Sequence, residues 1–230
     1  MNPLRLAYRN LLRFGFRLLY NELAWSYDSV SWTVSLGQWR TWQRAALPYL
    51  HGPRVLEIAF GTGDLLLDLR AAGFSVYGAD ISPYMVRVAS RKLRWAGAFV
   101  PIGRASAGAL PFAEGTFDSV VSTFPTPFIH QPNVLAEIAR VLRLGGRLVV
   151  VDRASLLHPA LLARLVDWLY LVTGQRADVH LSQTGWLTAL GWNAWEQEVV
   201  LESSVIHLLV AERGGEGHPI ELPSEIAALP

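Results

Sequence analysis

Residues 55–64, Val-Leu-Glu-Ile-Ala-Phe-Gly-Thr-Gly-Asp, constrain the fold more than any other segment of this sequence. Residues 54–58 form a short apolar run typical of a buried strand, and Gly61 and Gly63 follow it in a turn. Residues 64–72 then have the apolar spacing of a helix. A strand that passes through a glycine turn into a helix is the first part of a βαβ unit, so this segment predicts an α/β fold with a parallel sheet.

The alternation of strand and helix continues along the chain. Further strands are predicted at residues 75–79, 98–102, 117–123 and 146–152, and helices at residues 83–95 and 132–142. Two last strands, at residues 195–201 and 205–212, are joined by a short Glu-Ser-Ser turn and predict an antiparallel hairpin. We therefore expect a doubly wound, mostly parallel seven-stranded sheet with an antiparallel edge hairpin and a helical cap.

A chain of 230 residues is long enough for one domain with a continuous apolar core. We expect a single domain with five parts: a helical lid or flank (1–50), a sheet core (51–153), a helical cap (154–191), the edge hairpin (192–213) and a tail (214–230). The lid carries several tryptophans, whose large surfaces need a partner in order to be buried.

Charge and cysteine content exclude several classes of function. The net charge of +1 gives no strong field for polyanions, so nucleic acid is not an expected partner. The absence of cysteine removes disulfides, thiolate metal sites and cysteine nucleophiles, and no metal is expected. The apolar N-terminus is interrupted by arginines and no run of 18 apolar residues follows, so a cytoplasmic protein is the simplest interpretation.

The glycine turn and an acidic residue after the second strand point to a nucleoside ligand. Gly61 and Gly63 let a ligand approach the backbone, and the helix that begins near Asp64 points its positive end toward a ligand carboxylate. Asp80 ends the second strand, 23 positions beyond Glu57, where a carboxylate can accept both ribose hydroxyls. The third glycine of the dinucleotide fingerprint is absent, which disfavours a pyrophosphate site.

Residues 55–64 resemble motif I of the class I S-adenosylmethionine-dependent methyltransferases, in particular the branch of the ubiquinone/menaquinone-biosynthesis methyltransferases. Three further segments resemble that family in the same order. These are Asp80 with its neighbours, residues 105–122 with their Leu-Pro-Phe and Phe-Asp, and residues 137–152 with Glu-x-x-Arg-Val-Leu and Gly-Gly. The resemblance implies a Rossmann-like fold, S-adenosylmethionine as cofactor and S-adenosylhomocysteine as product.

The resemblance also implies a role for each matching residue. Glu57 would lie near the methionine amine, Gly61 and Gly63 under the cofactor, and Asp80 on the ribose. The remaining cofactor-binding candidates are Ile81 against the adenine, Ser106 and Ala107 at the adenine edge, Tyr27 over the methionine end, Ala59 in the turn and Thr123 at the end of the fourth strand. Simple core packing is an equal alternative for Tyr27.

Three residues depart from the family pattern. Ala59 replaces the usual first glycine, Ser106 stands where Asp or Asn is commoner, and Leu144 replaces a proline before Gly-Gly. An alanine is tolerated in the turn if its φ is negative, and a serine hydroxyl can still accept from an adenine amine. We therefore expect a functional pocket with altered contacts.

Methyl transfer to an amine or phenol requires that a proton be removed, and two histidines are candidate general bases. His130 follows the fourth strand and His180 falls in the cap, although a surface or structural role is the alternative for each. Phe124, Pro125 and Phe128 also follow the fourth strand and could shape a pocket for a lipophilic acceptor or merely fill the core.

The N-terminal segment, residues 3–20, carries an arginine at every fourth position: Arg5, Arg9, Arg13 and Arg17. This basic stripe predicts either peripheral membrane contact or a lid helix with its arginines in water. Three functions stay open: a methyltransferase for a small, lipophilic or aromatic acceptor through O, N or C, a membrane phospholipid head-group methyltransferase, and a non-catalytic cofactor-binding module.

Overall fold

The computed structural model describes residues 32, 35–157, 184, 187–188 and 191–214. The basic stripe of residues 3–20, Tyr27, His180 and most of the predicted cap lie outside the described residues. The described part of the fold is therefore the predicted sheet core and edge hairpin, with a short part of the preceding flank.

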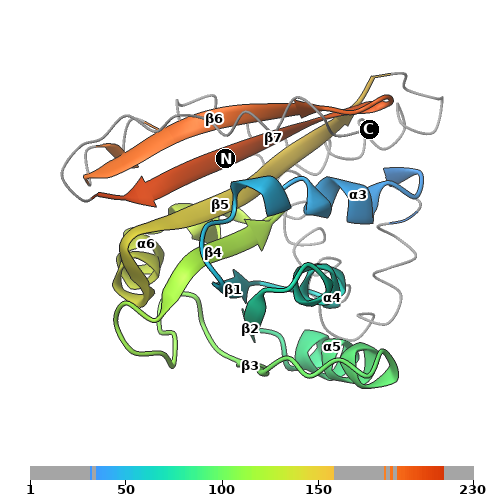
Figure 1. Cartoon of the computed structure of the whole chain (residues 1–230), viewed down its shortest axis with the longest axis horizontal. Coiled ribbons are helices and arrows are strands. Elements are labelled where there is room, and N and C mark those ends of the chain that lie inside the picture. Colours follow the sequence, from blue (N-terminus) through green and yellow to red (C-terminus); the bar gives the residue numbers. More distant parts are fainter. Residues whose placement is uncertain (1–31, 33–34, 158–183, 185–186, 189–190, 215–230) are drawn as a thin grey trace, which may run out of the picture.

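In the described part of the chain, seven strands form one sheet in the order β3-β2-β1-β4-β5-β7-β6 (Figure 1). The strands are β1 (Arg54–Ile58), β2 (Ser75–Asp80), β3 (Ile102–Arg104), β4 (Phe117–Thr123), β5 (Leu142–Leu156), β6 (Trp192–Val200) and β7 (Ser204–Arg213). The first five pair in parallel, whereas β7 pairs antiparallel with both β5 and β6. The predicted mostly parallel sheet with an antiparallel edge hairpin is confirmed.

Several predicted strands have other bounds than expected, and the sixth begins at Trp192 rather than at residue 195. The third strand does not occupy residues 98–102 but begins at Ile102, because Ala98 still closes the preceding helix by donating to the Leu93 carbonyl and Pro101 has no N–H to donate. β5 exceeds the predicted range of residues 146–152 at both ends, and its last residues pair with β7 beyond the end of β4. Pairing with β7 extends β5, so the local sequence carries no signal for this end of the strand.

Helices cover both faces of the sheet. α3 (Trp39–Arg44), α4 (Asp64–Ala71) and α5 (Pro83–Trp95) contribute to one core cluster, and α6 (Pro132–Val141) contributes to the other. Successive residues of β5 alternate between the clusters, with Val149 in the first and Val150 in the second, as the two-residue period of a strand requires. None of the described helices has the length and apolar character needed to cross a bilayer.

α3 lies between α4 and the strands β5 and β7 (Figure 1). Arg40 and Arg44 bind the buried Asp68 of α4, with N···O distances of 2.8 and 2.6 Å. On the other side, the Trp42 indole N–H donates to the Ser204 hydroxyl of β7 at 2.9 Å. The segment before β1 is thereby held over the carboxyl edge of the sheet.

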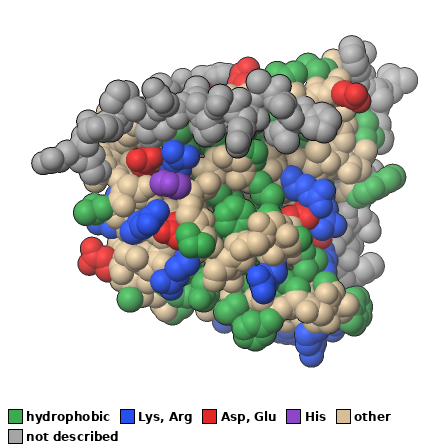
Figure 2. Space-filling model, in the orientation of Figure 1, with side chains coloured by type: hydrophobic (Ala, Val, Ile, Leu, Met, Phe, Trp, Pro, Cys, Tyr) green, Lys and Arg blue, Asp and Glu red, His purple; other side chains and the backbone are tan. Residues whose placement is uncertain are grey.

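Most large apolar side chains in the described residues are buried, but two aromatic ones near the end of α5 are not. Trp95 is 82% exposed and Phe99 is 84% exposed. In the space-filling view, hydrophobic and basic side chains lie next to each other over α5 and β3 (Figure 2).

Candidate functional site

The candidate site lies where β1, β2 and β4 end. These strands are parallel neighbours, so their carboxyl ends meet at one edge of the sheet. From β1 the chain continues to β2 and β3 on one side, and it then crosses to β4 on the other side of β1. The strand order reverses between β1 and β4, and such a topological switch point is the usual ligand-binding place of an open α/β sheet.

The turn after β1 has a left-handed backbone at three positions: Ala59 (φ +54°), Gly61 (φ +56°) and Gly63 (φ +83°). A Cβ at Gly63 would lie 2.9 Å from the Cβ of Ala89 on α5, so helix packing as well as backbone conformation requires glycine there. A Cβ at Gly61 would meet no atom within 4 Å, so the turn is open on that side. The turn therefore leaves room for a ligand to approach the backbone at Gly61.

Ala59 has a positive φ, whereas an alanine was expected to be tolerated in this turn only at a negative φ. Its N–H still donates to the Ala79 carbonyl at 2.8 Å, which continues the β1–β2 pairing by one residue. The chain then turns sharply, and a left-handed residue at this point makes the turn. The condition of a negative φ is therefore not met at Ala59.

Asp80 is held at the end of β2 by two backbone donors. Gly61 N–H donates to Oδ2 at 3.0 Å and Ser82 N–H donates to Oδ1 at 2.8 Å. Burial raises the pKa of Asp80, while these two hydrogen bonds act in the opposite direction. Each oxygen keeps a further lone pair, so the carboxylate can also accept from two ribose hydroxyls, the role implied by the sequence resemblance.

Glu57 is a fully buried carboxyl group on β1. Neither of its oxygens has a hydrogen-bond partner among the described residues. Burial raises the pKa of Glu57 well above its ordinary value, and the charges of Asp80, Asp64 and Asp68 raise it further. A buried carboxyl without a partner is costly unless a ligand satisfies it, and a ligand ammonium is the complementary group.

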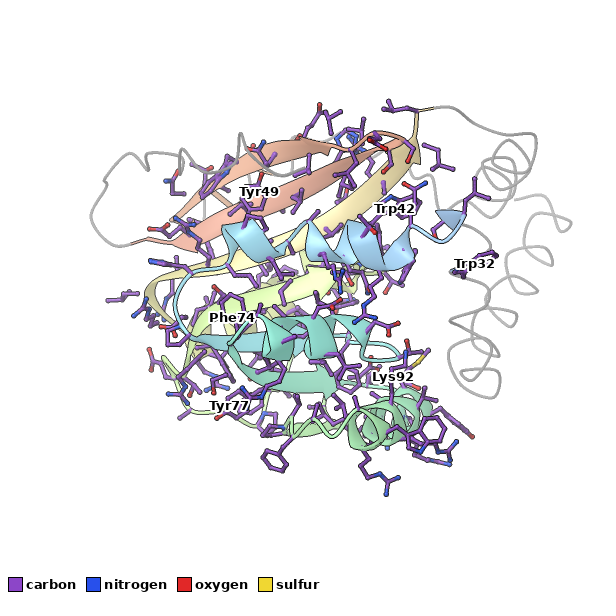
Figure 3. All side chains as sticks on the ribbon, turned by 45° about the vertical axis from the view of Figure 1, so that its right-hand side comes forward. Trp32, Trp42, Tyr49, Phe74, Tyr77 and Lys92 are labelled. Carbon is purple, nitrogen blue, oxygen red and sulfur yellow. The ribbon has the colours of Figure 1, made fainter. Side chains whose placement is uncertain are left out.

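α4 and α5 are braced where the turn ends. The Lys92 ammonium on α5 donates to the Asp64 carboxylate at 2.8 Å and to the Thr62 hydroxyl at 3.2 Å. Figure 3 shows Lys92 between the two helices. This bracing fixes the start of α4, whose N-terminal amides and positive dipole end face the site.

The segment predicted to contact adenine follows β3. Ala105 N–H donates to the Asp80 carbonyl at 3.0 Å, which brings Ser106 and Ala107 next to the end of β2. Ser106 is exposed and its hydroxyl accepts from Gly108 N–H at 3.3 Å, which leaves its own proton free for another acceptor. Ile81 is 65% exposed at the same edge. The described cofactor-binding candidates therefore gather around one end of the sheet.

Sequence reasoning missed the part of the site that α3 supplies. The Gln43 side chain donates to the Thr123 hydroxyl at 3.1 Å, and its buried Oε1 has no partner among the described residues. The Trp39 ring lies over Phe124, with 4.4 Å between centroids. Gln43 follows Trp39 by four positions, the spacing of one helix face, and a single amide within that aromatic face was the only signal in the sequence.

Phe124 is the second strained residue at this edge. Its φ is +49°, a conformation that costs a bulky side chain on the order of 1–3 kcal/mol and that clusters at functional sites. Phe124 packs against the α3 side of the sheet, whereas Phe128 packs against the core on the other face. The aromatic residues after β4 therefore do not form one shared pocket wall.

The structure describes one of the two predicted general bases, His130. His130 ends a short 3-10 helix, Pro127–His130, and its side chain is exposed. His180 and Tyr27 lie outside the described residues. The assignment of a general base stays a prediction.

Comparisons with known proteins agree with this geometry. A family described as "Methyltransferase domain" matches residues 56–150. A demethylmenaquinone methyltransferase from Symbiobacterium thermophilum is 31% identical over 182 residues, which cover 71% of this chain and 72% of the relative. One from Thermus thermophilus is 41% identical over 140 residues, 58% of this chain and 64% of the relative.

Solved structures of low sequence identity share the fold. A putative S-adenosylmethionine-dependent methyltransferase from Methanococcus maripaludis has a TM-score of 0.57 and 15% identity, with 83% of this chain and 93% of that chain covered. A geranyl diphosphate methyltransferase in complex with S-adenosylmethionine has a TM-score of 0.54 and 16% identity, with 76% and 85% covered. These likenesses concern the fold alone.

The curated relatives also place the chain within a branch of the family. A ubiquinone/menaquinone biosynthesis C-methyltransferase from Geotalea uraniireducens is 33% identical over 143 residues. The match spans 58% of this chain and 61% of that relative, so the chain covers about three fifths of the Thermus and Geotalea proteins and more of the Symbiobacterium one. The chain belongs to the class I S-adenosylmethionine-dependent methyltransferases, in the branch of the ubiquinone/menaquinone-biosynthesis enzymes.

Proposed function

We propose that the protein transfers the methyl group of S-adenosylmethionine to a ring carbon of a small, lipophilic quinone-type acceptor in its reduced, hydroquinone form. The observation that carries the proposal is the 31% identity to a demethylmenaquinone methyltransferase over 72% of that enzyme's length. The reduced form follows from chemistry, because a hydroquinone ring is electron-rich and its carbon can attack an electrophile, whereas a quinone ring is itself electrophilic.

The residues at the carboxyl edge fit the cofactor. Glu57 supplies a buried carboxyl that lacks a partner among the described residues and complements the ammonium of the methionine part. Asp80 supplies a fixed carboxylate for the ribose, and the turn at Gly61 leaves room for close backbone approach. When bound, S-adenosylmethionine supplies an electrophilic methyl group on a cationic sulfur.

The chain's own residues have three tasks in this reaction. Trp39 and Phe124 form an apolar surface beside the carboxyl edge of the sheet, where the cofactor would bind. This surface favours a lipophilic ring and excludes water. Gln43 fixes Thr123 and keeps one buried amide oxygen without a described partner, which can accept from a substrate hydroxyl. A base that takes the hydroxyl proton would raise the electron density of the ring, and His130 is the described candidate.

The test is a methyl-transfer assay with S-adenosylmethionine and three acceptors: a short-chain demethylmenaquinone kept reduced by dithionite, the same compound kept oxidised, and phosphatidylethanolamine vesicles. The expected result is a ring-methylated product from the reduced quinone alone, identified by mass spectrometry and NMR. Asp80→Ala is the matched control, since it should abolish both cofactor binding and turnover. Head-group methylation, or cofactor binding without turnover of any acceptor, would contradict the proposal.

A further inference from the structure

A basic and aromatic surface lies on the side of the molecule formed by α5 and the turn after it. We call this surface the α5 patch, and it consists of Arg87, Arg91, Arg94, Trp95 and Phe99. Single exposed apolar residues are ordinary, but two aromatic side chains, 82% and 84% exposed within five residues, are not. Hydrophobic and basic side chains are neighbours on this part of the surface (Figure 2).

Local structure explains why these residues point outward. α5 buries Met85, Ala89 and Leu93, which follow one another at four-residue intervals on its inner face. Arg87, Arg91 and Trp95 have the same spacing but start two residues later, so they share the opposite face.

Trp95, the last residue of α5, and Phe99 lie on either side of the turn that follows this helix. Ala98 N–H donates to the Leu93 carbonyl at 3.0 Å, and Gly97 has the left-handed φ of +63° that ends a helix in this way. Trp95 precedes this glycine and Phe99 follows it. Their exposure is therefore set by a well-defined backbone turn.

The charges of the α5 patch are not neutralised within the described structure. Residues 81–113 contain five of the 20 basic residues of the chain and none of its 19 acidic ones. Lys92 is paired with Asp64, but the other α5 cations form no ion pair with a described residue. Arg87 lies over the Tyr84 ring at 4.8 Å, and Arg94 donates only to the Ser90 carbonyl of its own helix.

We propose that the α5 patch docks the protein on the surface of an anionic phospholipid bilayer. Arginines bind lipid phosphates, while exposed tryptophan and phenylalanine side chains insert at the level of the head groups, so this combination fits a lipid surface. A nucleic-acid surface fits less well, because the whole chain has a net charge of only +1 and so gives no strong field for a long polyanion.

The direction of α5 determines how the docked protein is oriented. α5 begins at Pro83, three residues after Asp80 at the cofactor edge, and ends at Trp95 at the opposite edge of the sheet. A bilayer along the outer face of α5 therefore runs beside the sheet, next to β3. The cofactor edge then opens sideways, along the membrane, and docking leaves it accessible. This inference holds whether or not the proposed acceptor is correct.

The test is co-sedimentation of the full chain with phosphatidylcholine vesicles prepared with and without phosphatidylglycerol. The expected result is binding that requires phosphatidylglycerol and weakens with added salt. Combined Arg87→Gln, Arg91→Gln and Arg94→Gln should lower the partition coefficient by at least about tenfold. Combined Trp95→Ser and Phe99→Ser should lower it by about tenfold or more, since the buried apolar area is lost.

Two matched controls replace exposed residues elsewhere. Arg70→Gln on α4 and Leu144→Ser near the start of β5, where the side chain is 69% exposed, should leave vesicle binding unchanged. Circular dichroism and the urea midpoint should be the same for all variants, because every replaced side chain is exposed.

Two outcomes would overturn the proposal. The first is vesicle binding that survives the α5 variants but is lost when Arg5, Arg9, Arg13 and Arg17 become Gln, which assigns docking to the N-terminal stripe. The second is no vesicle binding, with a concentration-dependent dimer that Trp95→Ser and Phe99→Ser abolish in light scattering. A second copy of the chain would then be the occupant.

Discussion

Ala59 carries a conformation that suits glycine better than alanine. Its φ of +54° crowds the Cβ against the backbone, at a cost on the order of 1–2 kcal/mol. Ala59→Gly removes this cost but gives the unfolded chain more freedom, worth about 0.5–1 kcal/mol in the other direction. We expect the variant to be more stable by roughly 0.5–1 kcal/mol, measured as a higher urea midpoint at unchanged slope.

Ala136 provides the matched control for this prediction. It is exposed within α6, where its backbone is helical and glycine relieves no strain. Ala136→Gly should therefore destabilise the protein by about 1 kcal/mol. A loss of stability in Ala59→Gly as large as that in Ala136→Gly would show that the left-handed conformation is not strained.

The buried Glu57 predicts that cofactor binding releases a proton. Its pKa is raised well above the ordinary value in the free protein, chiefly by burial. A bound ammonium favours the ionised carboxylate and lowers this pKa, so between the two pKa values the proton leaves on binding. Calorimetric titration with S-adenosylhomocysteine, in two buffers of different ionisation enthalpy and over a series of pH values above the ordinary carboxyl pKa, should show proton release.

Glu57→Gln should bind more weakly and release no proton, while Glu202→Gln, at an exposed position in the hairpin turn, should behave like the wild type. Because the folded protein holds Glu57 protonated to higher pH than the unfolded chain, its contribution to stability falls as pH rises toward the raised pKa. Glu57→Gln should therefore be the more stable protein without ligand at alkaline pH. Equal proton release by wild type and Glu57→Gln would remove Glu57 from the ammonium site.

At the scale of elements, the contact between α3 and α4 depends on one carboxylate. Burial by itself would raise the pKa of Asp68, but hydrogen bonds from Arg40 and Arg44 outweigh it and leave the pKa lowered. A lowered folded pKa stabilises the protein above the unfolded pKa of about 4, and this contribution is lost as pH falls through the folded value.

Asp68→Asn should therefore lower the free energy of unfolding by about 1–3 kcal/mol at neutral pH, and the difference from wild type should shrink in acid. Urea titrations over a series of pH values measure this directly. Asp64→Asn, which breaks the α4–α5 brace to Lys92 instead, should leave the acid behaviour of the α3 contact intact. A difference between Asp68→Asn and wild type that is independent of pH would contradict the ion-pair account.

The elements that sequence predicted well are those whose ends carry a local signal. α5 begins at Ser82 and Pro83 as expected, and the Ser82 hydroxyl accepts from Met85 N–H at 3.3 Å. β5 was predicted too short because pairing with β7 extends it, and β3 was predicted too early because residues up to Ala98 still close α5. The part of the site that α3 supplies was missed because no local pattern shows that Gln43 reaches Thr123, 80 positions away.

At the scale of the whole molecule, the two ends of the described chain are joined over the site. Trp42 on α3 lies beside the β5–β7 part of the sheet, and its contact with Ser204 spans 162 positions (Figure 3). Gln38 accepts hydrogen bonds from both Ser203 and Ser204 at 2.9 and 3.1 Å. The first described helix and the last hairpin should therefore unfold in one cooperative transition.

A double-mutant cycle on Trp42→Phe and Ser204→Ala tests whether α3 and the hairpin are energetically coupled. Each single variant should lose about 1–2 kcal/mol, because Ser204 is fully buried and Trp42 nearly so, and the pair should be coupled by about 0.5–1.5 kcal/mol. Ser155→Ala, on the exposed side of β5 opposite Val205, is the control and should change stability by less than about 0.5 kcal/mol. The fluorescence and far-ultraviolet circular dichroism transitions should coincide in every variant. Additive losses, or two separate transitions in the wild type, would mean that α3 and the hairpin fold independently and that the wall over the cofactor edge can open without unfolding the sheet.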